Sequence, residues 1–439
     1  MGWAVLTLEN GGYGLKPDTY LTRIADDLLL RKLRSSGAVL IQGAQFCGKT
    51  STAWRASKSQ RFMQDPNRSA SYMKTADTKP SLLLRGAVPR LLDEWQSAPV
   101  LWDAVRFMGD TREGKPGQFI LTGSAVPKDD AILHTGTGRI SRLLMRPMSL
   151  FESLESNGSV SLKKLFDETS EVESTSELSI EGIAHAICRG GWPALIGQEE
   201  SVALDYAPDY VDSIIDADIS RVDGIKKNPM RVRALLRAYA RNIATMATLR
   251  TIRDDIALGN ADTSISEKTI REYLGALDRI FVTENLEAWN PALRAKTVVR
   301  TSVKRHFVDP SIATGVMRLT PSRLLDDFQY FGFLFESLCT RDLRISAEAI
   351  DGQIFHYHDA SGVESDAVIC LNDGRWAPVE VKLGSREIEE AALHLLQLRE
   401  KIDTGKMREP SFLMILTGGE CAYRRSDGVL VVPIGALGP

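Results

Sequence analysis

The sequence predicts an α/β protein that combines a parallel-sheet domain, a helical region and a second α/β domain. Three observations support this fold class. An apolar strand runs through a glycine-bearing loop into a helix at 39–55, three helix patterns follow one another at 228–290, and strand patterns alternate with helices at 329–439. Strands and helices that alternate up to residue 149 are typical of a parallel sheet.

The composition is that of a globular protein without a strong charge bias. Of the 439 residues, 25% are charged and 43% are hydrophobic, and the formal net charge is -3. A charge of this size does not drive the chain onto nucleic acid or membrane, so any nucleic-acid surface must be local. The chain shows no apolar run of membrane-spanning length, no signal-peptide pattern, and five scattered cysteines without a C-x-x-C pair. These features predict a cytoplasmic protein.

A loop of the form G-x-x-x-x-G-K-T follows the first apolar strand. Its glycines let the backbone fold around a phosphate, and the helix behind it adds its N-terminal dipole. In this arrangement Lys49 reaches the β- and γ-phosphates of ATP, and Thr50 holds Mg²⁺. A chance match in an ordinary turn is the competing interpretation, and the flanking strand and helix argue against it. The predicted binding residues are Gly43, Ala44, Gln45, Phe46, Cys47, Gly48, Lys49, Thr50 and Ser51.

A second apolar run ends in Leu-Leu-Asp-Glu at 91–94, downstream of this loop. We expect Asp93 to position Mg²⁺ and Glu94 to act as the general base on the attacking water. A third strand at 118–121 ends at Thr122, whose hydroxyl is expected to hydrogen-bond the γ-phosphate or that water. Read alone, the first pattern is also an ordinary strand end, and the second is also an ordinary turn cap.

Two further segments flank this predicted site. Residues 16–36 read as an amphipathic helix that packs beside the nucleotide, or as a helix that only faces the core. Arg139 follows a glycine pair and precedes an apolar strand. An arginine there would stabilise charge on the γ-phosphate, in cis or from a neighbouring subunit. A surface ion pair is the competing account of Arg139.

The middle of the chain changes character twice. Residues 151–182 are rich in Ser and Glu and poor in large apolar residues. We therefore expect a mobile connector or a loop-rich insertion there. A helix from Pro229, a short helix at 249–258 and a helix capped by Ser266 then lead into strands, which is the order of a winged helix.

A basic strip follows these helices. Between residues 288 and 308 the chain has no acidic residue and carries Arg294, Lys296, Arg300, Lys304 and Arg305. Such a strip suits contact with DNA phosphates. The alternative is a solvated face of a module that binds protein or another domain.

The last region holds a second group of candidate catalytic residues, on an ordered set of elements. Glu336 lies in an apolar helix, Asp366 begins a strand, and Glu380 and Lys382 belong to the strand after it. Alternate residues of a strand point to the same side, so Glu380 and Lys382 are expected to face one way. The elements are a helix at 331–338, strands at 353–358, 362–370 and 376–382, and a helix at 388–401.

These acids predict a second metal site. Asp366 and Glu380 on adjacent strands would chelate Mg²⁺ through oxygen, with Glu336 nearby. Lys382 would orient or activate the hydrolytic water. The alternative is a structural carboxylate–lysine cluster in a nuclease-like fold that does not cut.

With these motifs, the chain from about Leu15 to Val432 resembles a bacterial and archaeal family of AAA-type ATPases. Their N-terminal ATP-binding domain is followed by a domain that looks like a winged helix and a PD-(D/E)XK nuclease-like module. The residues that carry the resemblance lie at 43–50, 91–94, 121–124, 138–139, 146–152, 190–193, 364–366 and 379–382.

The resemblance implies ATP and Mg²⁺ as cofactors and an order of domains. A P-loop ATPase domain of the AAA type would occupy residues 1–150, and a connector with a helical segment 151–225. A winged-helix-like domain would occupy residues 226–325, and an α/β restriction-endonuclease-like domain 326–439.

Two functions are consistent with these observations. The first is a Mg²⁺-dependent ATP hydrolase that couples nucleotide state to a C-terminal DNA-binding or DNA-cleaving module. The second is a nucleotide-switched protein-interaction ATPase with a catalytically inactive nuclease-like scaffold. ATP is the predicted ligand of both, with DNA or a protein as the candidate partner. The sequence predicts no membrane contact and leaves the oligomeric state open.

Overall fold

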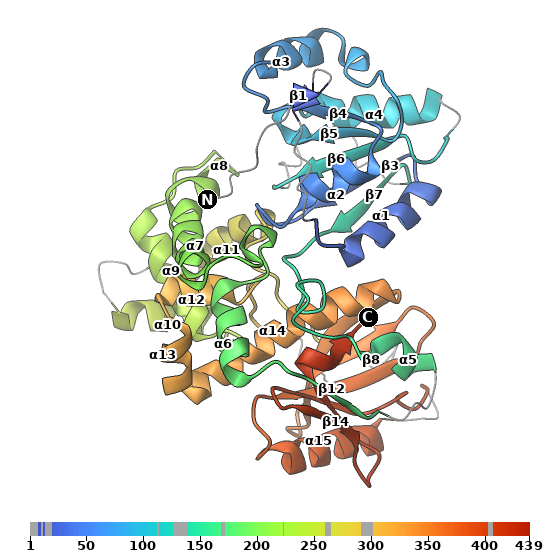
Figure 1. The fold of residues 1–439 in the computed structure, drawn as a ribbon. Helices are drawn as coiled ribbons and strands as arrows, with labels where there is room; N and C mark the ends of the chain where they lie inside the picture. Colours follow the sequence, from blue (N-terminus) through green and yellow to red (C-terminus); the bar gives the residue numbers. More distant parts are fainter. Residues whose placement is uncertain are drawn as a thin grey trace. The chain divides into compact units, whose positions relative to one another are not determined.

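The computed structural model describes residues 8–9, 12–13, 20–111, 114–125, 138–167, 172–222, 224–259, 265–290, 302–402 and 407–439. The chain divides into two compact units, residues 1–145 (unit 1) and 146–439 (unit 2). Figure 1 labels the elements of both units. The ranges that we predicted as connector, winged-helix-like and nuclease-like domains all lie in unit 2.

Unit 1 is built on a five-stranded parallel sheet with the strand order β4-β5-β6-β3-β7. This confirms the parallel α/β fold expected for the N-terminal part. The central segments pair in register from Ala38 to Gln42, and the predicted phosphate loop leaves the carboxyl end of β3. The elements are β1 Leu8–Glu9, β2 Gly12–Tyr13, α1 Ile24–Ser35, β3 Ala38–Gln42, α2 Lys49–Ala56, β4 Ser59–Phe62, α3 Ser69–Thr78, η1 Pro80–Leu82, β5 Arg90–Asp93, η2 Trp95–Ser97, α4 Val100–Thr111, β6 Phe119–Gly123 and β7 Ile140–Leu144.

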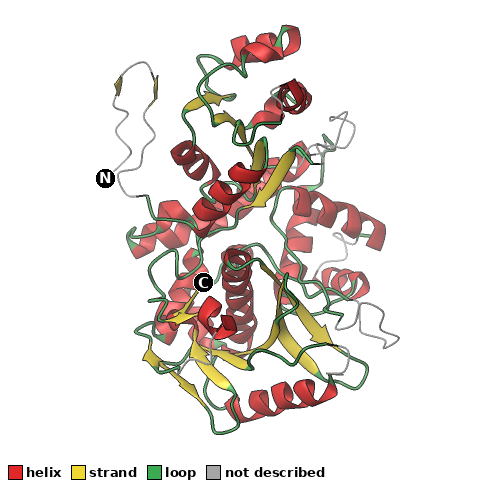
Figure 2. Ribbon diagram, turned by 90° about the vertical axis from the view of Figure 1, so that its right-hand side faces the viewer, coloured by secondary structure: helices red, strands yellow, loops and turns green. Residues whose placement is uncertain are grey.

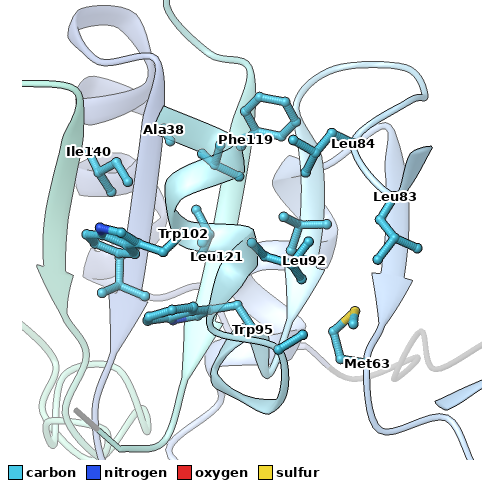
Figure 3. Packing of buried hydrophobic residues seen from close by; sticks show 14 of the residues in the cluster. Ala38, Met63, Leu83, Leu84, Leu92, Trp95, Trp102, Phe119, Leu121 and Ile140 are labelled. Atoms are coloured by element: carbon cyan, nitrogen blue, oxygen red, sulfur yellow. The ribbon is translucent and has the colours of Figure 1, made fainter. Parts of the chain in front are cut away.

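The core of unit 1 packs η2 and α4 against one face of this sheet. Alternate residues of the strands supply that face, as the two-residue period of a strand requires. Leu92 of β5 and Leu121 of β6 belong to the same cluster as Trp95 and Trp102 and lie beside them, as Figure 3 shows. The two indole rings are tilted against each other with their centroids 5.0 Å apart. This packing fixes the end of β5, where Asp93 and Glu94 lie.

The helix after the phosphate loop is shorter than we expected. We expected helix from Thr50 to about Gln64, but α2 ends at Ala56 and β4 follows it as an edge strand beside β5. All four residues of β4 are half-buried. A strand without a buried and an exposed face lacks the alternation that identifies strands in a sequence.

Unit 2 contains a helical part and a mixed sheet. The three helices expected at 228–290 are present as α9, α10 and α11, and Ser266 caps α11 by accepting a hydrogen bond from the Thr269 N–H. None of the helices in the described part of the chain is long and apolar enough to cross a membrane. The helices are α5 Leu162–Asp167, α6 Ile180–Arg189, η4 Pro193–Leu195, α7 Glu200–Ser213, η5 Ile214–Asp218, α8 Ile219–Arg221, α9 Pro229–Arg241, α10 Leu249–Gly259, α11 Glu267–Arg279, α12 Ser311–Met317, α13 Pro321–Asp326, α14 Phe328–Ala349, α15 Ile388–Lys401 and η7 Ile434–Ala436.

The sheet of unit 2 has seven strands in the order β10-β11-β12-β13-β15-β14-β9. An antiparallel meander, β10 to β12, is extended by β13 and β15 in parallel. α14 and α15 lie on opposite faces of this sheet, as Figures 1 and 2 show. The strands of unit 2 are β8 Val160–Ser161, β9 Ser174–Thr175, β10 Gly352–His358, β11 Glu364–Leu371, β12 Trp376–Lys382, β13 Met414–Thr417, β14 Cys421–Arg424, β15 Leu430–Pro433 and β16 Leu437–Gly438.

In residues 151–167 and 172–182, which the structure describes, ordered contacts replace the mobile connector that was one of our two expectations for this stretch. β9 pairs with β14 at the end of the large sheet, and β8 pairs with β16. Phe166 packs edge-to-face on Phe412, with 4.9 Å between the ring centroids. The Ser156 hydroxyl donates to the carbonyl of Leu437 at 2.7 Å. Serines that bond a distant backbone look like loop residues in the sequence, so composition alone was misleading here.

Two motifs of the resemblance, at 146–152 and 190–193, belong to a buried polar network in unit 2. Its cations are arginines, and each is paired with a carboxylate within 3 Å. The pairs are Arg146 with Glu284 (2.6 Å) and Glu348 (2.8 Å), Arg189 with Glu155 (2.7 Å), and Arg341 with Asp309 (2.7 Å) and Asp342 (2.8 Å). The Gly191 N–H also donates to Asp309. These motifs therefore have a structural role, because a buried charge needs such a partner.

Candidate nucleotide site and a second carboxylate cluster

The loop between β3 and α2 requires glycine at its two ends. Gly43 has φ 154°, and a Cβ there would lie 2.0 Å from the Met145 carbonyl oxygen. Gly48 has φ 102° and is the N-cap of α2. Glycine adopts these backbone angles without steric cost. The first turn of α2, which begins at Lys49, is therefore held directly against the loop.

Lys49 points back into the loop and is only 5% exposed. Its Nζ donates to the carbonyl oxygens of Gly43 (3.0 Å) and Ala44 (2.7 Å). Both acceptors are neutral, so the ammonium remains able to attract phosphate oxygens.

Asp93 joins the loop to the strands beside it. Its Oδ1 accepts hydrogen bonds from Thr50 Oγ1 (2.8 Å) and Thr122 Oγ1 (2.6 Å). Burial raises the pKa of Asp93, while the two hydroxyls and Lys49 oppose the shift. The structure thus brings together a carboxylate and a hydroxyl oxygen that are held by neutral donors. Hard oxygen ligands of this kind fit Mg²⁺.

Glu94 follows Asp93 in a left-handed backbone conformation, with φ 53°. Its N–H donates to Thr122 Oγ1 (3.0 Å), and its Oε2 accepts hydrogen bonds from Ser124 Oγ (3.1 Å) and Gln96 Nε2. Burial raises the pKa of Glu94, and Lys49, Gln96 and Ser124 oppose that shift. A buried carboxylate with a raised pKa suits a general base.

Thr122 connects the two acids. We expected its hydroxyl to meet the γ-phosphate or the water, but it donates to Asp93 and accepts from the Glu94 N–H. The contacts of Gln96 and Ser124 with Glu94 were not predicted. The sequence does contain a signal for these contacts, because Gln96 and Ser124 each follow a predicted site residue, Glu94 and Thr122, by two positions at the end of a strand.

The remaining loop residues shape and support the loop. The Cys47 thiol is buried and donates to the Met145 carbonyl at 3.3 Å, which suits a small packed residue. Ala44 is fully buried and Phe46 is 67% exposed. Gln45 and Ser51 are half-buried.

Residues before β3 brace this loop from the other side. Arg23 Nη1 donates to the Cys47 carbonyl at 2.9 Å. The Tyr20 hydroxyl lies 2.7 Å from Thr52 Oγ1, and the Arg55 guanidinium lies 4.4 Å from the centre of the Tyr20 ring. The expected lead-in helix is present as α1, while residues 16–19 lie outside the described part. The lead-in thus packs beside the predicted nucleotide site, and its contact with the base stays a prediction.

Arg139 lies at the opposite edge of the sheet from the phosphate loop. It precedes β7, whose first residue, Ile140, pairs with Ala38 at the amino end of β3, whereas the loop leaves the carboxyl end. Five strand residues span roughly 16 Å. Its Nε pairs with Asp110 at 2.7 Å, and both side chains are largely exposed. The structure therefore argues against action in cis and shows the surface ion pair that was the competing account.

The predicted residues of unit 2 do come together in space. Asp366 on β11 accepts a hydrogen bond from the Val381 N–H of β12 (2.9 Å). Glu380 and Lys382 face the same side of β12, with 3.4 Å between the Glu380 Oε2 and the Lys382 Nζ. Glu336 on α14 lies close to Asp366, because the two carboxylates accept hydrogen bonds from one shared partner.

That shared partner is Lys304, and it is an unexpected member of the cluster. Its Nζ donates to Glu336 Oε1 (2.6 Å) and to Asp366 Oδ1 (2.8 Å). The three side chains are only 12–13% exposed. We had placed Lys304 in a strip that contacts DNA phosphates, and the structure corrects that placement. Arg294, Lys296 and Arg300 of the same strip lie outside the described residues.

The three carboxyl groups of this cluster differ in the direction in which their pKa values are shifted. Burial, and then Asp366, raise the pKa of Glu336 to about 7, although Lys304 opposes the shift. Burial also raises the pKa of Glu380 well above its usual range. Burial alone would raise the pKa of Asp366, but Lys304 and Lys382 outweigh it and hold that pKa below its usual value. Lys304 and Asp366 are therefore the charged centre of the cluster.

A resident divalent metal does not fit this arrangement. In the ranges that the structure describes, no three His, Cys, Asp or Glu side chains are grouped so that they could hold a metal ion. Lys304 already neutralises Asp366 and contacts Glu336 where oxygen ligands would have to face a cation. The Mg²⁺ site expected at Asp366 and Glu380 is therefore not formed.

Comparisons with known proteins agree with the fold of the N-terminal part, and they match the rest of the chain to domains of unknown function. The profile of a family described as "AAA domain" matches residues 35–154. Two domains of unknown function, DUF8612 and DUF4143, match residues 180–323 and 331–437. No curated protein matches the chain. The first match supports an N-terminal ATPase domain.

Two solved structures show a distant similarity to the chain. A Walker-type ATPase of Pyrococcus abyssi is 16% identical, with a TM-score of 0.41, over 69% of this chain and 99% of its own. The ORC2 protein of Aeropyrum pernix, in ADPNP and ADP complexes, is 12% identical, with a TM-score of 0.29, over 69% and 91%.

Proposed function

We propose that this chain is a Mg²⁺-dependent ATP hydrolase whose nucleotide state governs its C-terminal unit. One observation supports the hydrolase above all others. Lys49, Thr50, Asp93 and Glu94 lie together at the carboxyl edge of a parallel sheet, where the Thr122 hydroxyl donates to the Asp93 carboxylate and accepts from the Glu94 N–H. The match of residues 35–154 to an AAA domain supports the same conclusion.

Each residue of this array has a role that its geometry suits. Lys49 and the loop N–H groups bind the phosphate oxygens. Thr50 and Asp93 hold Mg²⁺, which neutralises phosphate charge when it is bound. Glu94 takes the proton of the attacking water, and its carboxylate is positioned by Gln96 and Ser124.

Substitution of Glu94 tests the hydrolase. Glu94→Gln keeps the size of the side chain but cannot accept the proton, so steady-state phosphate release falls by about 10²–10⁴-fold while ATP binding is retained. Lys49→Ala removes the phosphate-binding ammonium and abolishes ATP binding. Glu389→Gln, at a side chain that is 80% exposed, is the matched control and leaves both unchanged. Unchanged turnover in Glu94→Gln removes Glu94 from the base role.

For unit 2 we favour a winged-helix-like region followed by a nuclease-like scaffold that does not cut. The helices α9 to α11 are followed by antiparallel bridges between Thr283 and Phe307 and between Leu286 and Lys304, which supports the winged-helix order. The β10–β12 meander with Asp366 and Glu380 supports the nuclease-like order. The pairing of Asp366 with Lys304 favours the inactive form.

DNA and a protein are the two candidate partners of unit 2, and its order of elements favours a test with DNA first. Phosphate release and strand cleavage are measured together, with and without single- and double-stranded DNA, in Mg²⁺ and in Mn²⁺. We expect salt-dependent binding that weakens when Arg294, Lys296 and Arg300 are neutralised, and no cleavage by the wild type. Absence of binding at low salt would favour a protein partner, and cleavage lost in Asp366→Ala would show an active nuclease.

A further inference from the structure

We propose that the Lys304 ammonium takes the place of a divalent cation in the cluster of Glu336, Asp366 and Glu380, so that the cluster binds Mn²⁺ or Mg²⁺ only after Lys304 is removed. The proposal rests on the nuclease-like part of the proposed function and is independent of ATP hydrolysis. It turns the disagreement between the expected metal site and the observed ion pairs into a property of this chain.

The first support is the position of the ammonium. Lys304 Nζ bridges a carboxylate on α14 and one on β11, at 2.6 and 2.8 Å. A metal held by these two acids would have to lie between the same oxygens, at the 2.0–2.6 Å that is typical of Mg²⁺ and Ca²⁺. An ammonium and a divalent cation cannot share that place, because both the volume and the charges conflict.

The second support is the way in which the backbone places this lysine. Lys304 and Leu286 exchange both of their backbone hydrogen bonds, each at 2.9 Å. The residue is thus fixed in an antiparallel bridge, and its side chain is 13% exposed. A surface lysine that swings into a cluster by chance would have neither a paired backbone nor a buried side chain.

The third support is a carboxylate oxygen that the two lysines leave without a hydrogen bond. Glu380 is 1% exposed, and its Oε1 is buried without a hydrogen-bond partner, while its Oε2 lies 3.4 Å from Lys382. A buried polar atom without a partner is costly, so a cation beside Glu380 Oε1 would remove an unfavourable contribution. Ala367 pairs with Val379 across β11 and β12, so the next residues of the two strands, Asp366 and Glu380, lie beside each other on one face of the sheet.

The charges then explain what removal of the lysine would do. Without Lys304, Glu336 and Asp366 would be buried acids that lack their shared cation, which is strongly unfavourable. A divalent cation is the ligand class that restores this balance, since it takes carboxylate oxygens from several elements at once. The Glu380 Oε1 would then also gain a partner.

Binding of Mn²⁺ to the nucleotide-free, full-length protein tests the proposal, with the free ion followed by electron paramagnetic resonance. Lys304→Met keeps most of the apolar stem and removes the charge. It is expected to bind one Mn²⁺ per chain at least tenfold more tightly than the wild type. The site is expected to disappear in Lys304→Met/Asp366→Asn, and the charge-preserving control Lys304→Arg is expected to bind like the wild type.

Three results would overturn the proposal. The first is a wild type that binds Mn²⁺ as tightly as Lys304→Met, at a site that Asp366→Asn removes. The second is a folded Lys304→Met protein that binds no Mn²⁺. The third is a Lys304→Met protein that is unfolded by circular dichroism and stays unfolded in millimolar Mn²⁺, because the proposal requires the metal to replace the lysine. Refolding on addition of Mn²⁺ would support it.

A strand-cleavage assay on Lys304→Met keeps this test apart from the proposed function. Mn²⁺ binding without cleavage upholds the cation replacement and shows that the scaffold lacks another catalytic element. Absence of ATP turnover in the wild type would remove the proposed hydrolase and leave the Mn²⁺ result intact.

Discussion

The predicted nucleotide site of unit 1 and the acidic cluster of unit 2 both contain buried carboxylates, and the donors that contact these carboxylates differ. In unit 1, Asp93 is held by two threonine hydroxyls. In unit 2, Glu336 and Asp366 are held by the ammonium of Lys304. Neutral donors leave the charge of a carboxylate available to an incoming cation, whereas an ammonium neutralises it in place. The donors, and not the acids themselves, decide whether such a cluster is ready to bind a metal.

The same substitution in both units gives the largest expected effect and tests this comparison directly. Asp366→Asn leaves the buried Lys304 with one carboxylate instead of two, and loss of this hydrogen bond between charged groups lowers the free energy of unfolding by about 2–3 kcal/mol. Asp93→Asn keeps an acceptor for both hydroxyls and removes a buried charge, so the change is less than about 1 kcal/mol. Urea unfolding with native-state hydrogen exchange of β11 and β5 amides measures each unit separately.

The control for this pair is an exposed aspartate. Asp373 pairs with Arg375 at 2.7 Å with half of its side chain exposed, so Asp373→Asn changes stability by less than about 1 kcal/mol.

The stability that Asp366 contributes depends on pH, because its pKa is held below its usual 3.8. Its contribution is therefore fully present above that value and lost as the pH falls through the lower folded pKa. Equal losses in Asp93→Asn and Asp366→Asn at pH 7 would break the comparison.

The two sites also differ in how far the sequence could predict them. In unit 1 the strand, loop and helix follow one another, and the Asp-Glu pair, 43 residues beyond Thr50, is marked by its place at the end of a later strand. In unit 2 the acids were predicted to meet, and they do. Lys304 was missed because no motif links it to Glu336 and Asp366, which lie 32 and 62 residues further along the chain. A lysine among other basic residues reads as a solvated one, since nothing local encodes a distant partner.

Two predictions of secondary structure were wrong for a related reason. The edge strand β4 has no buried face, and the stretch 151–182 contributes short strands whose partners lie at 421–422 and 437–438. Periodicity detects an element by its own burial pattern. An element that is stabilised mainly by pairing with a distant segment leaves no such pattern, so these parts required the structure.

A smaller effect is expected where the neutral donors of unit 1 are removed. Gln96→Ala and Ser124→Ala each delete a hydrogen bond that lowers the pKa of Glu94, which burial has raised. The pKa therefore rises further, and because the base acts when ionised, the acid limb of turnover moves to higher pH. Phosphate release at pH 6 falls about tenfold, and release at pH 9 stays within about threefold of the wild type.

The pH profile separates this role from a structural one. A general loss of folding lowers turnover equally at both ends of the profile, whereas loss of a positioning residue lowers it mainly at the acid end. Ser97→Ala serves as the control and leaves the profile unchanged, because the Ser97 hydroxyl accepts a hydrogen bond from Gln64 and is not a donor to the Glu94 carboxylate. A uniform fall in Gln96→Ala would show that the neutral donors do not tune the base.

The smallest effect tests whether the carboxyl edge of unit 1 holds the whole site. Arg139 lies at the amino edge and pairs with Asp110, with side chains that are 52% and 40% exposed. Exposed pairs contribute about 0–1 kcal/mol to stability. Arg139→Ala and Asp110→Ala should therefore each change the free energy of unfolding by no more than about 1 kcal/mol and leave phosphate release within about twofold of the wild type.

Turnover measured over a range of protein concentrations tests whether Arg139 acts from a neighbouring subunit. If Arg139→Ala lowers turnover 10³-fold or more while Asp110→Ala does not, and if wild-type turnover per chain rises with concentration, the arginine acts from a neighbouring subunit. The neutral-donor site of unit 1 would then be complete only in an oligomer, whereas the lysine-filled cluster of unit 2 is complete within one chain.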